Sequence, residues 1–368
     1  MNIAIFSPNR NPYSETFIQA HKTYLNGRIF YYFGSKHRLQ LEGKDQLISR
    51  PEQKLFRIKK YLFRKSNSWL AEQRILSSIY KNQIDVLLIE YGTHAHHLLP
   101  ILKQLDIPVV VHFHGYDASM TSVVENTNYY KEVFHLASKV IVVSRVMEKM
   151  LYDMGCPKEK VVYNVYGPQP EFESITPSFD KKQFVSVGRF TDKKAPYYTI
   201  LAFKKVIERH SDAKLIFAGE GDLLNTCKNL VKHFNLDKNI QFLGVISPKD
   251  YRELLSDSLA YVQHSITAIS GDMEGTPLAI LEASVAGLPV VATIHAGIPD
   301  VIIHGDTGLL CEEHDVDTMS KHMLMVIDDV DLAKEMGRKA KAHILKYFNI
   351  QRHIDQLYAI LSKVSNAE

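Results

Sequence analysis

The most informative segment of this chain reads Gly271-Asp272-Met273-Glu274-Gly275-Thr276-Pro277-Leu278-Ala279-Ile280-Leu281-Glu282-Ala283 and contains two glutamates eight residues apart. Thr276 suits the N-cap of a helix, and Pro277 suits the first helical position, whose N–H has no acceptor within the helix. Gly287 is expected to end this helix after about three turns. The N–H groups at such a helix start can bind an anion or sugar hydroxyls, and carboxylates can accept hydrogen bonds from further hydroxyls. The segment therefore predicts a polar ligand site, although two solvated glutamates on an amphipathic helix would also satisfy the pattern.

Composition limits the class of protein. The 368 residues exceed one ordinary hydrophobic core and favour two domains. No apolar run reaches the roughly 18 residues that a membrane span needs, and the start Met1–Phe6 has no basic leader, so secretion is not expected. Three widely spaced cysteines favour a reducing cytoplasm over a disulfide framework or a zinc site. A net charge of +3 is too small to indicate a nucleic-acid partner.

Short β-branched runs alternate with helix-length segments, which predicts parallel sheets covered by helices. The runs expected to be strands are 2–6, 28–33, 85–90, 108–113, 139–144, 183–188, 214–218, 239–243, 259–263 and 289–293. We expect two doubly wound α/β domains that face each other across a cleft. The N-terminal domain is expected over residues 1–166, a proline-rich linker over 167–180 and the C-terminal domain over 181–345. Residues 346–368 are expected to form a helix that packs on its own domain or crosses back to the first.

Ligands of open α/β sheets collect at the carboxyl ends of the strands. The strand at 183–188 runs into Gly188-Arg189-Phe190-Thr191-Asp192-Lys193-Lys194. A glycine there lets the backbone approach a ligand closely, the Arg189 guanidinium can grip phosphate oxygens, and Lys194 adds a point charge. Taken alone, the same two cations would also be typical of surface charge.

A second candidate follows the strand at 108–113, in His112-Phe113-His114-Gly115-Tyr116-Asp117. His114 can hydrogen-bond a sugar hydroxyl or exchange a proton near neutral pH, whereas His112 is as readily a packed histidine. In the first loop Ser14 is a candidate N-cap. That loop lacks Gly-x-Gly-x-x-Gly, which disfavours a dinucleotide dehydrogenase.

No histidine–carboxylate cluster has the spacing of metal ligands, so no metal is expected. The two Asp-x-Asp motifs at 315–317 and 329–331 are interpreted as surface acids.

A basic stretch, Lys54–Lys65, has six cations and no acid. On a helix its leucines and isoleucine share one stripe, while its arginines and Lys60 line the opposite one. Such a helix can rest on anionic lipid, each cation contributing about 1 kcal/mol near the surface. It could equally be a solvated helix that covers the first domain.

Together these motifs resemble glycosyltransferase family 4, retaining enzymes of the GT-B fold, over nearly the whole chain. The motifs that carry the resemblance are Glu274-Gly275-Thr276-Pro277 with Glu282-Ala283, Gly287–Thr293, Ala296–Asp300, Gly305–Gly308 and Gly188-Arg189 with Lys194. Ser14–Phe17 and His114–Asp117 are similar to members that build exopolysaccharide, capsule or colanic-acid-like glycans. The chain departs from the family in a first loop without a Gly-Gly pair and in Ala195, Ala296 and Asp300.

The resemblance implies roles for the candidates. Glu274 would bind the donor sugar near the reacting carbon and His114 would orient that sugar. Arg189 and Lys194 would neutralise the leaving nucleotide diphosphate. The implied donor-binding residues are Gly188, Val245, Gly275, Thr276, Pro277, Leu278 and Glu282, of which Glu282 would hold the ribose hydroxyls and Val245 lies in a segment that offers main-chain groups to the base. Ser14 and Glu15 are further candidates in the first loop.

The activity implied by the resemblance is a metal-independent retaining glycosyltransferase without a cofactor, in the cytoplasm or peripherally on the inner face of the membrane through Lys54–Lys65. It would move a hexose from a nucleotide-diphosphate sugar to a hydroxyl of a glycan, in particular a lipid-linked surface glycan. Two alternatives stay open: a sugar-nucleotide epimerase or phosphorylase of the same architecture, and a non-catalytic sugar-nucleotide-binding protein.

Overall fold

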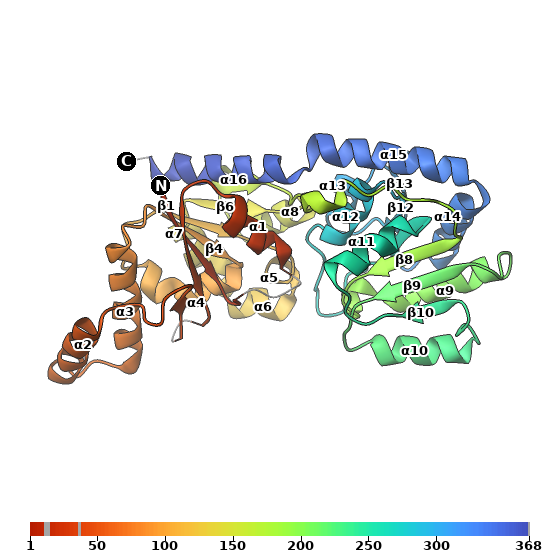
Figure 1. Cartoon of the computed structure of the whole chain (residues 1–368). Helices are drawn as coiled ribbons and strands as arrows, with labels where there is room; N and C mark the ends of the chain where they lie inside the picture. The colour runs from red at the N-terminus through yellow and green to blue at the C-terminus, as the bar shows by residue number, and fades with distance from the viewer. Residues whose placement is uncertain (11–14, 36–37, 367–368) are drawn as a thin grey trace. The chain divides into compact units, whose positions relative to one another are not determined.

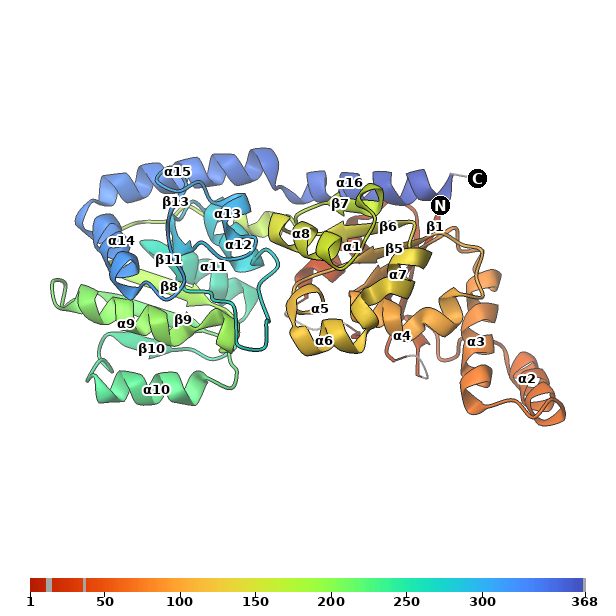
Figure 2. The same ribbon diagram turned by 180° about the vertical axis from the view of Figure 1, so that it is seen from behind.

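The computed structural model describes residues 1–10, 15–35 and 38–366 (Figure 1). The chain divides into two compact units. Unit 1 comprises Met1–Asn164 and the chain from His353 onward, and unit 2 comprises Val165–Arg352. Each unit is built on a sheet of mostly parallel strands covered by helices (Figures 1 and 2), so the predicted doubly wound α/β class is confirmed within each.

The sheet of unit 1 has seven strands in the order β3-β2-β1-β4-β5-β6-β7, and only β3 is antiparallel to its neighbour. The strands are β1 Asn2–Ser7, β2 Arg28–Phe33, β3 Gln40–Leu41, β4 Val86–Glu90, β5 Val109–His112, β6 Lys139–Val142 and β7 Val161–Tyr163. The central strands β1, β4 and β5 read as continuous apolar runs because helices cover both of their faces. The edge strands β3 and β7 were not predicted, since each is too short to carry a pattern.

The helices of unit 1 are α1 Thr16–Tyr24, α2 Arg50–Leu62, α3 Asn67–Lys81, α4 Gly92–Leu102, α5 Tyr116–Ser119, α6 Thr121–Asn126, α7 Lys131–Leu136, α8 Arg145–Asp153 and, from its fourth residue, α16 Ile350–Ser365. Helix α16 buries Ile354, Leu357 and Leu361. It is fastened to the end of β7, because the Asn164 side chain donates to the His353 carbonyl at 3.1 Å and the Gln356 side chain donates to the Tyr163 carbonyl at 3.1 Å.

The sheet of unit 2 has six parallel strands in the order β10-β9-β8-β11-β12-β13. The strands are β8 Gln183–Val187, β9 Lys214–Ala218, β10 Ile240–Phe242, β11 Ala260–Gln263, β12 Val290–Thr293 and β13 Gly308–Cys311. The helices are α9 Pro196–Ile207, α10 Leu224–His233, α11 Pro248–Ser256, α12 Leu278–Ala286, α13 Ile298–Val301, α14 Val316–Asp328 and α15 Val330–Tyr347. Strand β13 was not predicted. The predicted linker contains a 3-10 turn, Pro170–Phe172, whose Phe172 ring packs 5.2 Å from the Tyr251 ring.

Helix α12 begins one residue later than predicted. It starts at Leu278, so the N-cap is Pro277 rather than Thr276. The reason is the ψ angle of Pro277, which at 116° is extended and keeps that residue outside the helix. The predicted stop is confirmed: Gly287 has φ 97°, a left-handed conformation that suits glycine. In α1 the N-cap is Glu15, and the predicted N-cap Ser14 lies outside the described residues.

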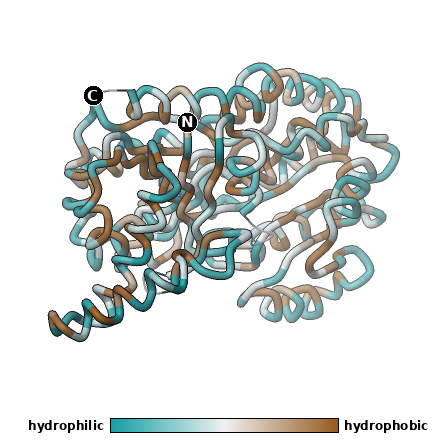
Figure 3. The backbone as a smooth tube through the Cα atoms, turned by 60° about the vertical axis from the view of Figure 1, so that its left-hand side comes forward, coloured by the Kyte–Doolittle hydropathy of each residue, from teal (hydrophilic) through white to brown (hydrophobic). Residues whose placement is uncertain are grey.

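The basic stretch forms a helix for most of its length. Helix α2 ends at Leu62, so the last three residues of Lys54–Lys65 lie beyond it, and Arg64 has a left-handed φ of 48°. None of the residues of α2, all of which the structure describes, is buried. Hydrophobic and hydrophilic positions alternate along it in Figure 3, and its packing partner is α3. None of the helices in the described part of the chain combines the length and hydrophobicity needed to span a bilayer.

Candidate functional site

In unit 2 the strand order reverses between β8 and β11, which pair directly. Ligands of open α/β sheets bind outside the carboxyl ends of the strands at such a switch point. The loop after β8 contains Gly188, and the loop after β9 contains Gly219, with φ 129°. A Cβ atom on Gly219 would lie 2.0 Å from the Gly188 carbonyl oxygen, so the two backbones touch where a side chain would separate them.

The loops after β8 and β11 meet in an ion pair. The Lys194 ammonium lies 3.1 Å from a carboxylate oxygen of Glu274, and both side chains are largely buried. Gly188 lies against the Lys194 side chain, because a Cβ on Gly188 would contact Lys194 Cε at 3.4 Å. The structure therefore brings together three of the predicted site residues, Gly188, Lys194 and Glu274. Gly188 and Glu274 are 86 positions apart in the sequence.

The charges at this place favour an anion. Burial lowers the pKa of Lys194, and the neighbouring positive charges of Lys193 and Arg189 lower it further, against the opposing effect of Glu274. Burial also acts to raise the pKa of Glu274, but Lys194, Lys193 and His295 outweigh it and hold that pKa below its usual value. Arg189 itself is exposed. An additional anion beside Arg189 and Lys194 would relieve the mutual repulsion of the cations.

The second lysine of the pair, Lys193, has a different position. Its ammonium donates to Asp272 Oδ1 at 2.9 Å and to the Met273 carbonyl at 3.1 Å. Lys193 thus ties the loop after β8 to the segment that precedes Glu274. The sequence analysis selected Lys194 for the site and gave Lys193 no role.

Two residues that the sequence did not single out hold Glu274 in place. The Glu274 backbone N–H donates to His295 Nε2 at 3.1 Å, and His295 Nδ1 lies 2.6 Å from Glu313 Oε1. The Gly297 N–H donates to the Gly275 carbonyl at 2.9 Å. His295 follows the carboxyl end of β12, so a search of every strand end would have found it.

Glu282 lies in the second turn of α12 and is only 8% exposed. Burial raises the pKa of its carboxyl to about 7, while a hydrogen bond with Tyr251 opposes that shift. The pKa of Tyr261, on β11, is raised first by burial and then by the negative charges of Glu282 and Glu274. The carboxylates of Glu282 and Glu274 therefore both lie close enough to Tyr261 to raise its pKa, and they do not belong to unrelated surfaces.

The remaining predicted residues of unit 2 lie at the same edge of the sheet. Gly275, Thr276, Pro277 and Leu278 lead from Glu274 into α12, whose first N–H groups have no acceptor within the helix. Val245 follows β10 and is 48% exposed, an uncommon position for valine. In contrast, the acids at 315 and 329 are helix N-caps: Asp315 accepts from the Thr318 N–H at 2.8 Å and Asp329 from the Leu332 N–H at 2.9 Å.

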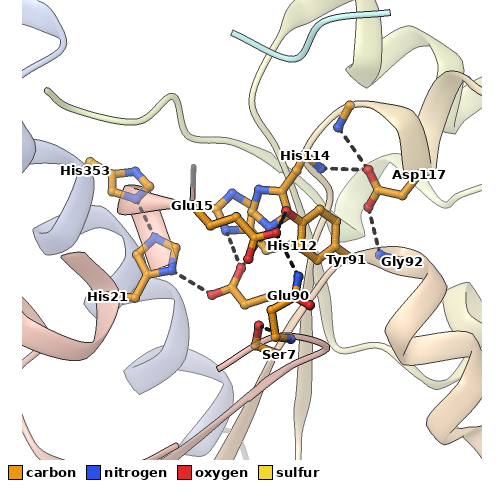
Figure 4. A network of polar contacts seen from close by, with 12 residues as sticks. Ser7, Glu15, His21, Glu90, Tyr91, Gly92, His112, His114, Asp117 and His353 are labelled. Carbon is orange, nitrogen blue, oxygen red and sulfur yellow. Dashed lines mark hydrogen bonds and ion pairs between the residues drawn. The ribbon is translucent and has the colours of Figure 1, made fainter. Parts of the chain in front are cut away.

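In unit 1 the strand order reverses between β1 and β4, and a buried cluster lies at this second switch point (Figure 4). Glu90, the last residue of β4, is 0% exposed. One of its oxygens lies 2.7 Å from His21 Nδ1 and the other 2.9 Å from His114 Nε2. His21 Nε2 in turn lies 2.9 Å from His353 Nε2, which α16 contributes.

His114 is held by aromatic rings as well. Its ring centroid lies 4.5 Å from that of Tyr91 and 4.6 Å from that of Phe17. The Tyr91 hydroxyl donates to Glu15 Oε1 at 2.9 Å. Tyr91 therefore contacts both His114 and the predicted candidate Glu15. Ser14, the other candidate in the first loop, is outside the described residues.

Asp117 fixes the loop that carries His114. Its fully buried carboxylate accepts from the backbone N–H groups of Gly92 at 2.9 Å, His114 at 3.0 Å and Gly115 at 2.9 Å (Figure 4). The loops after β4 and β5 are therefore joined through one side chain. His112 takes the packed position that the sequence left open: it is 0% exposed, and burial lowers its pKa to about 3.

Models of known protein families match both units. The model described as "Glycosyltransferase Family 4" matches residues 29–164, and the model described as "Glycosyl transferases group 1" matches residues 169–343. The chain thus carries a glycosyltransferase family 4 domain and a glycosyl transferases group 1 domain. The resemblance inferred from the motifs is thereby confirmed.

Relatives of the chain include glycosyltransferases of polysaccharide synthesis. WcaL of Escherichia coli (strain K12), named for colanic acid biosynthesis, is 27% identical over 65% of this chain and 60% of its own length. The amylovoran biosynthesis glycosyltransferase AmsK of Erwinia amylovora is 28% identical over 76% of this chain and 70% of its own length. The chain thus spans about 60% of the length of WcaL.

The solved structure of Anabaena Alr3699/HepE in complex with UDP-glucose has a similar fold. It matches 98% of this chain and 99% of that chain with a TM-score of 0.77 at 15% sequence identity. This likeness concerns the fold and agrees with the predicted GT-B fold.

Proposed function

We propose that the protein is a retaining glycosyltransferase that moves a hexose from a nucleotide-diphosphate sugar to a hydroxyl of a growing surface glycan. The observation that carries the proposal is the buried Lys194–Glu274 pair beside Arg189 at the switch point of unit 2. It supplies cations for a diphosphate and, next to them, a carboxylate for sugar hydroxyls. The matches to the family 4 and group 1 models and the names of WcaL and AmsK support a glycan as the product.

The donor would lie along the carboxyl edge of the unit 2 sheet. Arg189 and Lys194 would bind the diphosphate, and Glu274 would accept hydrogen bonds from the sugar. Glu282 would accept hydrogen bonds from the ribose hydroxyls. These hydroxyls would take the place of the water that the buried Glu282 carboxylate lacks. Val245 and its neighbours would contact the base.

The proposed reaction breaks the bond between the anomeric carbon and the leaving phosphate oxygen. The acceptor oxygen bonds to that carbon on the same face, and the acceptor proton passes to the leaving diphosphate, so the configuration is retained. Arg189 and Lys194 would stabilise the charge that develops on the diphosphate. Because two side-chain cations do this, the proposal includes neither a metal nor another cofactor.

We further propose that the acceptor is lipid-linked, and the exposed apolar side chains of α2 support this. The exposed fractions of its apolar side chains are 49% for Leu55, 56% for Ile58, 85% for Tyr61 and 66% for Leu62. Phe63, just beyond the helix, is also 66% exposed. Apolar and cationic side chains exposed together suit the surface of an anionic membrane, where a lipid-linked acceptor would be found.

The test is product analysis. Purified protein is screened against nucleotide sugars by thermal shift, since a bound donor stabilises by mass action, and each hit is incubated with glycan acceptors. We expect a glycoside with the anomeric configuration of the donor, and a turnover lowered roughly 100-fold in Arg189→Ala. The matched control is Arg209→Ala, an exposed arginine of the same unit that pairs with Asp328. An epimerised nucleotide sugar formed without acceptor, or donor binding without any product, would reject the transferase in favour of an epimerase or a binding protein.

A further inference from the structure

The buried cluster of unit 1 forms one continuous chain of contacts, His353–His21–Glu90–His114, which we call the histidine–carboxylate chain (Figure 4). Its members come from α16, α1, β4 and the loop after β5. The exposed fraction of His21 and Glu90 is 0%, that of His353 is 1%, and the His114 side chain is 4% exposed. Of its members, only His114 is a residue to which the family resemblance gives a role, that of orienting a sugar.

We propose that Glu90 fixes a single tautomer of His114, with the proton on Nε2, and thereby makes Nδ1 the ring atom that accepts a hydrogen bond from a sugar hydroxyl. Glu90 is then a positioning residue. The sugar as ligand rests on the proposed function, whereas the tautomer rests on the chain alone.

The direction of the two protons that face Glu90 follows from the carboxylate. Glu90 is an acceptor when ionised, so His21 must donate through Nδ1 and His114 through Nε2. A neutral His21 that donates through Nδ1 accepts through Nε2, so His353 donates to it through its own Nε2. The protons on His21 Nδ1 and His114 Nε2 therefore point toward Glu90 whether or not His21 is charged, and the proton on His353 Nε2 does so when His21 is neutral.

Glu90 is ionised in this environment. Burial acts to raise its pKa, but His21, His112 and His114 together outweigh burial and hold the pKa well below its usual value. These are the groups that face it: His21 from α1, and His112 and His114 from β5 and its end, with His353 of α16 behind His21. A buried carboxylate needs such donors, since an unpaired one would be costly.

A metal ion is the competing explanation for this cluster. Donor atoms of His21, Glu90 and His112 all lie within 4.8 Å of one another. Two ligands of one tetrahedral zinc would lie about 3.3 Å apart, given bonds of about 2.0–2.1 Å. Within this group the distance from His21 Nδ1 to Glu90 is 2.7 Å, a hydrogen-bond distance that is shorter than the separation of two zinc ligands, whereas His112 Nδ1 lies 3.5 Å from the other Glu90 oxygen. We therefore favour protons over a metal between these atoms.

The substitution Glu90→Gln tests the assignment because it keeps the shape of the side chain. One end of an amide is an NH2 group, which cannot accept a hydrogen bond. The histidine that faces this end, either His21 or His114, must reverse its tautomer or lose the contact. The matched control is Glu42→Gln, which changes a half-buried glutamate of the same unit that pairs with Lys22.

The measurement is long-range 1H–15N correlation NMR of the full-length protein labelled with 15N-histidine, with the His114 signals assigned from His114→Gln. We expect the Nε2–H tautomer of His114 in the wild type and in Glu42→Gln, and a changed tautomer of His114 or His21 in Glu90→Gln. A wild-type His114 protonated on Nδ1 would overturn the proposal, and so would tautomers and ring-nitrogen shifts of both His21 and His114 that stay unchanged in Glu90→Gln. So would ring-nitrogen signals of the chain that shift when EDTA is added, because they would reveal a metal.

If Glu90→Gln does not fold, the tautomer of His114 in the wild type still tests the proposal. Adding UDP-glucose separates this inference from the proposed function. A shift of the His114 Nδ1 signal supports both. The Nε2–H tautomer without any response to this or other nucleotide sugars would keep the tautomer assignment and count against a sugar contact at His114.

Discussion

Lys194 and Glu274 form a 3.1 Å ion pair between the loops that follow β8 and β11. Each depends on the other, because both side chains are largely removed from water. The pair couples the place where a diphosphate would bind to the place where a sugar would bind. A substrate that neutralised Lys194 would also change the surroundings of Glu274.

Removing one partner should cost more stability than removing both. Lys194→Ala leaves the Glu274 carboxylate buried and unpaired, and we expect a loss of about 3–5 kcal/mol at pH 8. Glu274→Gln in the Lys194→Ala background should recover part of that loss. Denaturant unfolding of both single variants and the double variant measures the coupling. Additive losses would contradict the pairing.

Glu282 should make the protein less stable as the pH rises. Its pKa of about 7 is above the unfolded value, so the folded state holds the proton more tightly between about pH 4.5 and 7. Stability from this group is present below that window and is lost as the pH rises through it. We expect Glu282→Gln to melt higher than the wild type at pH 8 and similarly at pH 4.5. Glu253→Gln, which changes an exposed glutamate of α11, is the control, and an equal difference at both pH values would refute the assignment.

Asp117→Asn should loosen the loop that carries His114. The amide retains one acceptor oxygen but presents an NH2 group to a backbone N–H, where the carboxylate accepted three hydrogen bonds. We expect a loss of about 2–3 kcal/mol, the scale for hydrogen bonds to a charged group. Asp106→Asn, at an exposed position of unit 1, should have almost no effect. Equal melting temperatures of the two variants would contradict the role of Asp117.

Replacing cations of α2 should weaken binding to anionic vesicles. We expect Arg57→Glu/Lys60→Glu to abolish sedimentation with phosphatidylglycerol-containing vesicles at low salt, and high salt to release the wild type. The control, Lys228→Glu/Lys232→Glu, changes exposed lysines of α10 by the same charge. Recovery of the wild type in the supernatant at both salt concentrations would rule out the membrane contact.

The sequence was sufficient for the fold because its signals are local. All ten predicted strands are present, with ends within two residues of the prediction, since each buried strand is a continuous apolar run. The strands that were not predicted are short or lie at the edge of a sheet. They are β3, β7 and β13. The start of α12 was wrong by one residue because the ψ angle of Pro277 is set by the loop and not by its own ring.

The candidate sites were predicted only in part. Motifs led to Gly188, Lys194 and Glu274, which the fold brings together. Glu90 could not be found in this way, because its environment is assembled from residues as distant as His21 and His353. Its carboxylate stands at the end of a strand that otherwise reads as buried and apolar, and that was the one local signal available.

The most direct test of the central claim is calorimetric titration of nucleoside diphosphates and the matching nucleosides into the wild type, Arg189→Ala and Arg209→Ala. UDP, GDP and ADP are compared with uridine, guanosine and adenosine at one salt concentration. We predict that the wild type and Arg209→Ala bind one diphosphate at least about tenfold more tightly than its nucleoside, and that Arg189→Ala loses most of this difference, about 1.4 kcal/mol or more. A wild type that does not distinguish any diphosphate from its nucleoside, or an Arg189→Ala variant that distinguishes them as well as the wild type, would contradict the account.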